Sequence, residues 1–200
     1  MSDIRICFLG DSFTNGTGDP TYLGWTGRVC ADVESAGAKA SVTHYNLGIR
    51  GNTSQQIEAR WQMETNLRFP PGCDARTVFS FGTNDARMEA GAVLLETAAS
   101  VIHAKRILER AKAQYPTLMI GPLPIEDRAM NVRIREILTA YADVCAEIDV
   151  PYLDAFTPLS ENLIWMREVA LVDGAHPAAA GYAELAAIVS SWSAWQDWFS

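Results

Sequence analysis

Short apolar runs alternate with longer amphipathic segments along the whole of this 200-residue sequence. Five runs are predicted as strands, each ending next to a glycine or an aspartate: residues 4–9, 42–47, 77–81, 118–120 and 152–153. Apolar residues at helical spacing follow each of them: residues 25–34, 54–66, 94–115, 134–148 and 185–199. This alternation predicts an α/β fold, a five-stranded parallel sheet with helices on both faces and right-handed crossovers.

Local signals place the ends of several of these helices. Gly37 is predicted to stop the first helix, and Thr53 or Ser54 to cap the second. Pro177 falls near the first turn of the last helix, where proline is favoured. The sequence has no linker, internal repeat or low-complexity segment, and its length suits one domain. We therefore expect a single domain over residues 1–200.

The charge balance argues against two classes of partner. Asp and Glu total 24 against 16 Lys and Arg, which gives a net charge of -8. Without a basic cluster, we expect neither nucleic-acid binding nor adhesion to an anionic membrane. The sequence also has no apolar run of about 18 residues and no N-terminal signal pattern. A cytoplasmic protein is therefore expected.

The cysteines and two of the histidines carry no chemical signature. The four cysteines are widely spaced and form no Cys-x-x-Cys pair: Cys7, Cys30, Cys73 and Cys145. Cys7 and Cys145 lie in apolar runs, which favours buried, reduced thiols, and no histidine has the spacing of a metal ligand. His44 and His103 have no carboxylate three or four residues away, so we assign both a structural role.

Glycines and polar side chains gather where the predicted strands end. The first three strands are followed by Gly10-Asp11-Ser12, Arg50-Gly51-Asn52 and Gly82-Thr83-Asn84-Asp85, and the last helix is preceded by Asp173-Gly174-Ala175-His176. Ligands bind at the carboxyl edge of such sheets. Each motif alone is also a common turn. Their joint occurrence, in order and at successive strand ends, favours a catalytic site.

These residue types suit nucleophilic catalysis. The Ser12 hydroxyl needs an adjacent base, and histidine is the side chain best matched to that task near neutral pH. Asp173, three residues before His176, can reach the imidazole and fix its tautomer. The developing oxyanion needs preorganised donors. The candidates are the backbone N–H groups of Ser12 and Gly51 and the side-chain amide of Asn84.

As a set, the four motifs resemble those of the SGNH hydrolases, the GDSL esterase/lipase family, over residues 4 to about 181. Ser12, Gly51, Asn84 and His176 match the four residues after which that family is named. The resemblance implies a flavodoxin-like, three-layer α/β/α sandwich. It also implies a triad of Ser12, His176 and Asp173, with neither a metal nor another cofactor.

Two details concern the fit to that family. Phe13 follows the serine where the family's motif has leucine. Gly48 is a second candidate for the oxyanion glycine, but Gly51 better matches the family's Gly-Asx-Thr-Ser context.

The resemblance implies a serine esterase that acts on a small-molecule ester. We expect a small acyl group; thioesters and lysophospholipids are alternative substrates within the family. The acyl pocket depends on three loops that carry no recognisable code: residues 13–24, 122–131 and 155–172.

Two other classes of function compete with an esterase. A metal-dependent phosphohydrolase would hold Mg²⁺ through Asp11, Asp85 and Asp154, which all follow predicted strands. That hypothesis leaves the remaining motif residues without roles. A binding module with an inactive site is disfavoured, because every expected catalytic residue is present.

Three further features have two interpretations. Arg50 and Arg87 flank the proposed site, and we expect each to be solvated or paired with Asp85 or Glu89 rather than to attract an anionic substrate. Four aromatic residues repeat at helical spacing near the end of the sequence: Trp192, Trp195, Trp198 and Phe199. We expect this cluster to dock on the core or to form a subunit contact in a homo-oligomer, rather than to bind carbohydrate.

Overall fold

The computed structural model describes residues 2–35 and 40–200, and it confirms the predicted α/β class. Gly37 lies outside the described residues. Five parallel strands form one sheet in the order β2-β1-β3-β6-β7. They are β1 (Ser2–Gly10), β2 (Ala40–Gly48), β3 (Asp74–Ser80), β6 (Thr117–Ile120) and β7 (Tyr152–Leu153). This strand order is flavodoxin-like.

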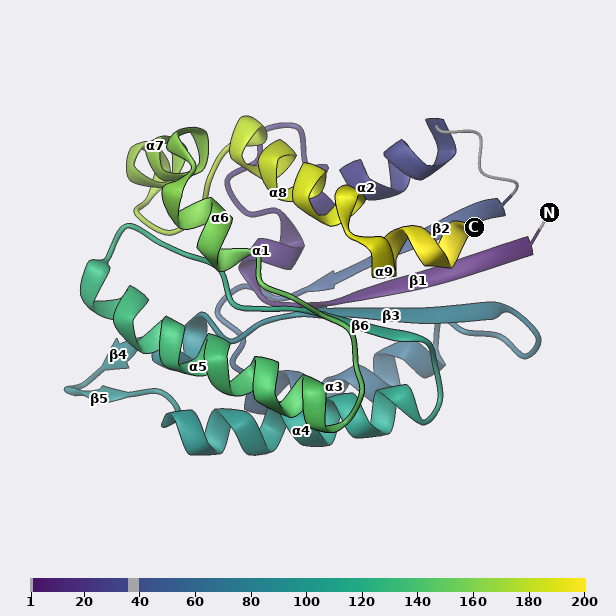
Figure 1. The fold of residues 1–200 in the computed structure, drawn as a ribbon, viewed down its shortest axis with the longest axis horizontal. Helices are drawn as coiled ribbons and strands as arrows, with labels where there is room; N and C mark the ends of the chain where they lie inside the picture. Colours follow the sequence, from purple (N-terminus) through teal and green to yellow (C-terminus); the bar gives the residue numbers. More distant parts are fainter. Residues whose placement is uncertain (1, 36–39) are drawn as a thin grey trace.

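Helices cover both faces of the sheet (Figure 1). On one face, α2 (Gly24–Ser35) packs against α8 (Ala179–Ser191). On the other face, three helices lie in sequence order, with α4 packed between its neighbours: α3 (Ser54–Asn66), α4 (Thr97–Lys112) and α5 (Arg128–Glu147). The arrangement is the expected three-layer α/β/α sandwich.

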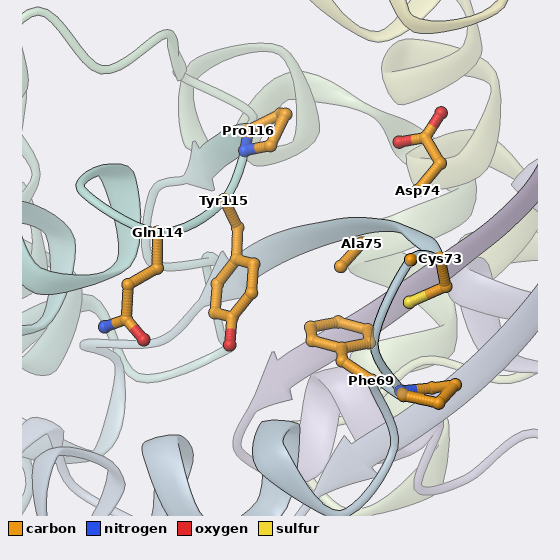
Figure 2. A pocket seen from close by; sticks show the side chains of 9 residues that line it. Phe69, Cys73, Asp74, Ala75, Gln114, Tyr115 and Pro116 are labelled. Atoms are coloured by element: carbon orange, nitrogen blue, oxygen red, sulfur yellow. The ribbon is translucent and has the colours of Figure 1, made fainter.

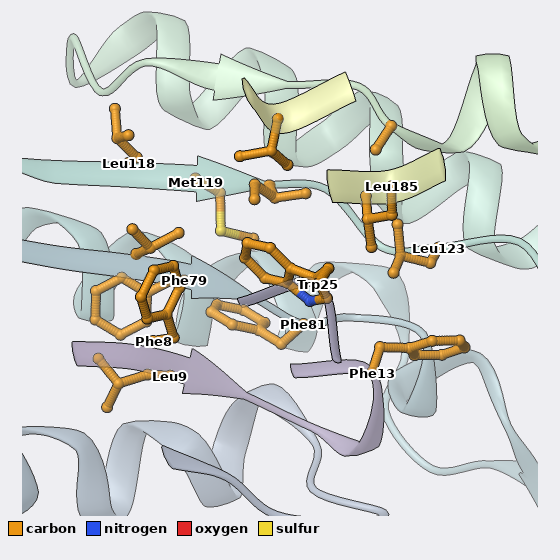
Figure 3. Packing of buried hydrophobic residues seen from close by; sticks show 14 of the residues in the cluster. Phe8, Leu9, Phe13, Trp25, Phe79, Phe81, Leu118, Met119, Leu123 and Leu185 are labelled. Carbon is orange, nitrogen blue, oxygen red and sulfur yellow. The ribbon is translucent and has the colours of Figure 1, made fainter. Parts of the chain in front are cut away.

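The position of β1 explains its continuous apolar sequence. The strand lies between β2 and β3, helices cover both of its faces, and residues 6–9 are completely buried. Trp25 of α2 meets Phe8 edge-on, with the ring centroids 5.4 Å apart (Figure 3). A strand that is buried on both faces needs apolar residues at successive positions rather than at every second one.

A capping box fixes the start of α3. The Thr53 hydroxyl accepts from the N–H of Gln56, and the Gln56 side chain accepts from the N–H of Thr53 at 2.9 Å. Thr53 is therefore the cap and Ser54 is the first helical residue. Because Gly51 lies two residues earlier, the cap also fixes how the loop after β2 enters the helix.

The predicted helix over residues 185–199 is wrong beyond Ser191, where α8 ends and Trp192 takes an extended conformation. Two short helices follow: α9 (Ser193–Gln196) and η2 (Asp197–Phe199). The break lets Trp195 turn onto the core, where it is buried and its ring centroid lies 6.1 Å from that of Phe8. Packing of the Trp195 side chain thus ends the helix although the apolar spacing continues beyond it. The structure confirms that the aromatic cluster docks on the core.

The predicted helix over residues 94–115 begins too early. A small hairpin precedes it: β4 (Met88–Glu89) and β5 (Ala92–Val93). The N–H groups of Leu94 and Leu95 then donate to the carbonyls of Arg87 and Asp85 instead of entering a helix. These bonds tie the hairpin back to η1 (Asn84–Ala86), the short turn after β3.

All three segments expected as loops contain helical residues, and residues 122–131 include the first turn of α5, which begins at Arg128 rather than at residue 134. Residues 155–172 are largely helical, and residues 13–24 begin inside a single helical turn. The elements concerned are α1 (Ser12–Asn15), α6 (Phe156–Glu161) and α7 (Leu163–Val172). Asn162 caps α7 by accepting from the N–H groups of Ile164 and Trp165, both at 2.9 Å.

Candidate active site

Asp173 and His176 form a compact turn between α7 and α8. One carboxylate oxygen of Asp173 accepts from the N–H groups of Ala175 and His176, at 3.0 and 2.8 Å. The other lies 2.8 Å from His176 Nδ1. Gly174 enables this turn, because its φ of +80° lies in the left-handed region. The carboxylate therefore holds both the backbone and the ring of His176.

Electrostatics favour the ionised form of Asp173. Partial burial by itself would raise the pKa of this carboxyl, but the hydrogen bonds from the N–H and ring of His176 and from the Ala175 N–H outweigh burial. The net result is a pKa below the ordinary value. An ionised acceptor beside Nδ1 selects the tautomer that carries its proton there, which leaves Nε2 as an acceptor.

Ser12 lies at the first turn after β1, directly in reach of that acceptor. Its Oγ is 2.7 Å from His176 Nε2. Asp11 caps α1 by accepting from the Phe13 N–H at 3.0 Å, which sets the orientation of the turn. The structure thus brings the predicted serine, histidine and aspartate into one hydrogen-bonded series, although Ser12 and His176 are 164 residues apart.

Aromatic side chains pack against the imidazole of His176. The Phe13 ring lies 5.1 Å from the His176 ring and 6.1 Å from Trp165, which is completely buried. Trp165 Nε1 donates to the Pro124 carbonyl at 3.1 Å, so α7 is tied to the loop after β6. Phe13, the departure from the family's leucine, therefore contacts the histidine. Trp165 was not predicted, because its position is decided by the packing of α7.

A second unpredicted residue, Glu168, holds the start of α8. Its Oε2 accepts from the N–H groups of Ala178 and Gly181, at 2.9 and 2.6 Å. These donors belong to the first turn of a helix, where N–H groups otherwise lack partners. Because His176 lies two residues before Ala178, the bond from α7 also limits the movement of the histidine.

The loop after β2 presents Gly51 in a turn. The N–H of Asn52 donates to the Ile49 carbonyl at 3.2 Å, and Gly51 at the third position has a φ of +78°. A type II turn requires this φ at that position. In the described part of the chain, the N–H of Gly51 has no hydrogen-bond acceptor. The N–H of Gly48, by contrast, donates to the Asn46 side chain at 3.0 Å, so Gly51 is the better candidate for a ligand donor.

Asn84 opens η1 at the end of β3. Its Nδ2 donates to the Asn52 carbonyl at 3.0 Å and lies 3.4 Å from a carboxylate oxygen of Asp11. The preceding residue, Thr83, links this loop to the next one, because its hydroxyl donates to the Leu123 carbonyl and accepts from the Leu123 N–H. Asn84 thus contacts both the Gly51 turn and the Ser12 turn.

The aspartates proposed as metal ligands have separate environments. Asp85 is completely buried, and its carboxylate accepts from the Ser54 N–H at 2.9 Å and pairs with the Ser100 hydroxyl at 2.5 Å. Asp154 accepts from the N–H and hydroxyl of Thr157 at the start of α6. Within residues 2–35 and 40–200, no cluster of three or more acidic, histidine or cysteine side chains is arranged to hold a metal ion.

The remaining polar residues have local roles. Arg87 pairs with Glu89 at 3.3 Å, as expected, while Arg50 is exposed. His44 Nε2 lies 3.0 Å from the Thr26 hydroxyl, and burial lowers the pKa of this imidazole. His103 has a carboxylate partner that its neighbours in the sequence do not reveal: its Nδ1 lies 2.5 Å from the Glu58 carboxylate on α3. None of the described helices is both long and apolar enough to span a membrane.

The pocket in Figure 2 lies at the amino ends of the parallel strands, opposite the carboxyl ends that the proposed site residues follow. It is lined by residues at or before the starts of β3 and β6, including Phe69, Cys73, Asp74 and Tyr115. The rings of Phe69 and Tyr115 lie 5.0 Å apart. No predicted site residue contributes to this pocket, and ligands of such folds bind at the carboxyl edge instead.

This three-layer fold places a serine, a histidine and a carboxylate in one hydrogen-bonded series, an arrangement that recurs among hydrolases of unrelated folds. The chain belongs to the GDSL-like lipase/acylhydrolase family, whose model matches residues 8–184.

Solved structures of other proteins have the same fold. A lipase/acylhydrolase from Enterococcus faecalis superposes with a TM-score of 0.76 at 22% identity, over 95% of this chain and 94% of that one. An acetylxylan esterase from Geobacillus stearothermophilus gives a TM-score of 0.73 at 20% identity, over 92% and 91%. The uncharacterized protein YpmR of Bacillus subtilis is 19% identical over 166 residues, which are 83% of this chain but 56% of that protein. The chain therefore spans little more than half the length of that relative.

Proposed function

We propose that this protein is a serine esterase that hydrolyses carboxylic esters with small acyl groups, and that residues 1–200 act as one catalytic domain. The observation that carries the proposal is the series of contacts at Ser12, His176 and Asp173, with 2.7 Å from Oγ to Nε2 and 2.8 Å from Nδ1 to the carboxylate. These distances are within the range in which a base can accept the proton of a nucleophile.

The proposed reaction has two halves. Ser12 Oγ attacks the ester carbonyl carbon while its proton moves to His176 Nε2, and the carbonyl oxygen becomes an oxyanion. The N–H groups of Ser12 and Gly51 and the Asn84 amide donate to that oxygen. His176 then returns the proton to the leaving alcohol, and an acyl-enzyme remains. Water attacks the acyl-enzyme by the same route, with His176 as base, and releases the acid.

The comparisons support a small acyl group and the two central roles by analogy. The Geobacillus stearothermophilus neighbour is an acetylxylan esterase, and two of its solved structures are catalytic mutants that replace a serine or a histidine with alanine. Thioesters and lysophospholipids remain the alternative substrates. Nitrophenyl esters of increasing chain length, with acetylxylan, an acyl-coenzyme A and a lysophospholipid alongside, would separate these classes.

The decisive experiment replaces the nucleophile. We expect Ser12→Ala to abolish hydrolysis of nitrophenyl acetate with little change in melting temperature, because only a hydroxyl is lost. An organophosphonate should label the wild-type protein at Ser12, as peptide mass mapping would reveal. Ser191→Ala is a matched control, since the Ser191 hydroxyl is exposed and donates only within its own helix, to the Ile188 carbonyl.

Three outcomes would contradict the proposal. They are full activity of Ser12→Ala, labelling at another residue, and loss of all activity in EDTA with recovery in Mg²⁺. The last outcome would favour the phosphohydrolase hypothesis.

A further inference from the structure

The guanidinium of Arg60, in the middle of α3, is hydrogen-bonded to three segments next to the proposed site: the ends of β1 and β2 and the turn after β2. Its Nη2 donates to the Gly10 carbonyl at 2.8 Å and its Nη1 to the Leu47 carbonyl at 3.0 Å. Its Nε donates to the Asn52 side chain at 2.8 Å. One planar group therefore ties together the carboxyl ends of β1 and β2 and the turn that contains Gly51.

Each of the proposed oxyanion donors lies close to one of these anchor points. Gly10 is two residues before Ser12, and Asn52 directly follows Gly51. The Asn52 carbonyl in turn accepts from Asn84 Nδ2 at 3.0 Å. Arg60 is thus linked to all three donors within two residues or one additional hydrogen bond.

The environment of Arg60 makes this bridge rigid. The side chain is only 13% exposed, and Glu64 one turn later fixes Nη1 with an ion pair at 2.9 Å. Hydrogen bonds from a charged donor are roughly twice as strong as neutral ones. The fork of the guanidinium holds several acceptors in a fixed relative geometry, which the single ammonium of a lysine cannot do.

We propose that Arg60 is a positioning residue for the oxyanion hole, an inference that rests on the esterase function proposed above. It acts by holding the Gly51 turn, and through it Asn84, at a fixed distance from the Ser12 turn. The donors bond most strongly to the charge that develops on the carbonyl oxygen. Displacing them therefore lowers kcat and leaves KM nearly unchanged.

The test combines Arg60→Lys with Asn52→Ala, singly and together. Arg60→Lys should lower kcat for nitrophenyl acetate by about 10- to 100-fold, the range expected for a small misplacement of catalytic groups. Asn52→Ala should lower it less, because only the side-chain anchor of the turn is lost. If Arg60 acts through Asn52, the double variant should be no worse than Arg60→Lys, because the second change removes a bond already lost.

A transition-state mimic separates positioning from a general structural effect. The serine oxygen adds to the carbonyl carbon of a trifluoromethyl ketone. The resulting hemiketal carries a charged oxygen where the oxyanion of the ester reaction would form. Its inhibition constant should rise across the variants in proportion to the loss of kcat/KM. Arg76→Lys is the matched control: Arg76 is 11% exposed, pairs with Asp74 at 2.6 Å and donates to the Trp198 carbonyl, away from the site. Its melting temperature should fall while kcat stays unchanged.

Several results would overturn the inference. They are wild-type kcat in Arg60→Lys, a change confined to KM, multiplicative losses in the double variant, and an equal loss of kcat in Arg76→Lys. If Arg60→Lys fails to fold, Asn52→Ala alone provides the test, and its inhibition constant for the trifluoromethyl ketone should rise in proportion to its loss of kcat/KM. An inactive Ser12→Ala beside a fully active Arg60→Lys would refute only the role of Arg60, whereas a fully active Ser12→Ala would refute the esterase function itself.

Discussion

The two halves of the site are assembled in different ways. Asp173 and His176 lie within one turn of four residues, and the hydrogen bonds that orient the ring are made inside that turn. The proposed donors Ser12, Gly51 and Asn84 come from three loops after three strands. They are related only through contacts between distant segments, such as the bond from Asn84 to Asn52. The acid–base half should therefore respond to local changes, and the donor half also to changes made elsewhere in the fold.

The largest effect is expected in the local half. Asp173→Asn should lower kcat on the order of 10⁴-fold, because an amide no longer fixes the imidazole tautomer. The turn should persist, since the Asn oxygen can still accept the backbone N–H groups, so the melting temperature should change little. Asp154→Asn is the control, because Asp154 also accepts from a backbone N–H and a side chain, but both belong to Thr157, which is not part of the proposed site. Equal losses in both variants would contradict a specific role for Asp173.

A smaller loss is expected from a single donor in the other half. Asn84→Ala should lower kcat by about 100- to 1000-fold with KM nearly unchanged, as for other single oxyanion donors. Asn84→Asp should be at least as damaging, because a carboxylate repels both the oxyanion and the nearby Asp11. Steady-state kinetics and thermal melts of both variants measure this. If Asn84 only closes a turn, the aspartate variant would keep near-full kcat.

Glu168 tests whether the local half also depends on a distant contact. Glu168→Ala removes the acceptor for two N–H groups at the start of α8 and should lower the free energy of unfolding by about 1 kcal/mol, as for the loss of a helix cap. The decrease in kcat should be smaller than for Asn84→Ala, because the Asp173 turn still orients His176. Urea denaturation and kinetics on the same samples provide the comparison. A loss of kcat as large as that of Asp173→Asn would mean that the acid–base half is not self-contained.

The smallest expected effect is on stability rather than on rate, and it involves two carboxyls whose pKa values move in opposite directions. Burial raises the pKa of Asp11 to about 7, while hydrogen bonding lowers that of Asp173. The folded state thus retains the Asp11 proton between the unfolded pKa of 3.8 and about 7. Stability from Asp11 should fall as pH rises through that window, whereas stability from Asp173 is present above the unfolded pKa and is lost as pH falls.

Urea denaturation of the wild-type protein and Asp11→Asn at several pH values measures the first of these contributions. The free energy of unfolding of the wild type, relative to the variant, should decrease between about pH 4 and pH 7 and then level off. A difference that is constant over this range would contradict the raised pKa of Asp11.

Contacts that helical spacing does not include explain the two helix ends that the sequence patterns misplaced. Trp195 turns onto Phe8 and breaks a helix that the apolar spacing continues to residue 199. Leu94 and Leu95 fit the period of α4, but their N–H groups donate to the loop after β3. In both cases the partner lies outside the four-residue reach of a helix, at Phe8 for Trp195 and at Arg87 and Asp85 for the two leucines, so no helical spacing rule includes it.

The sequence by itself determined where the polar site residues lie along the chain. An apolar run, a glycine and a polar group recur at the ends of strands, and a parallel sheet brings these ends together on one side. It also determined the Asp173–His176 pair, because three residues of separation suffice for contact. Only the tertiary structure decided that Ser12 Oγ meets His176 Nε2 at 2.7 Å and that Arg60 joins the ends of β1 and β2. The physical reason is that such contacts depend on how α3 and α8 pack against the sheet, and an arginine inside an amphipathic helix looks the same in the sequence whether it faces water or two carbonyl groups.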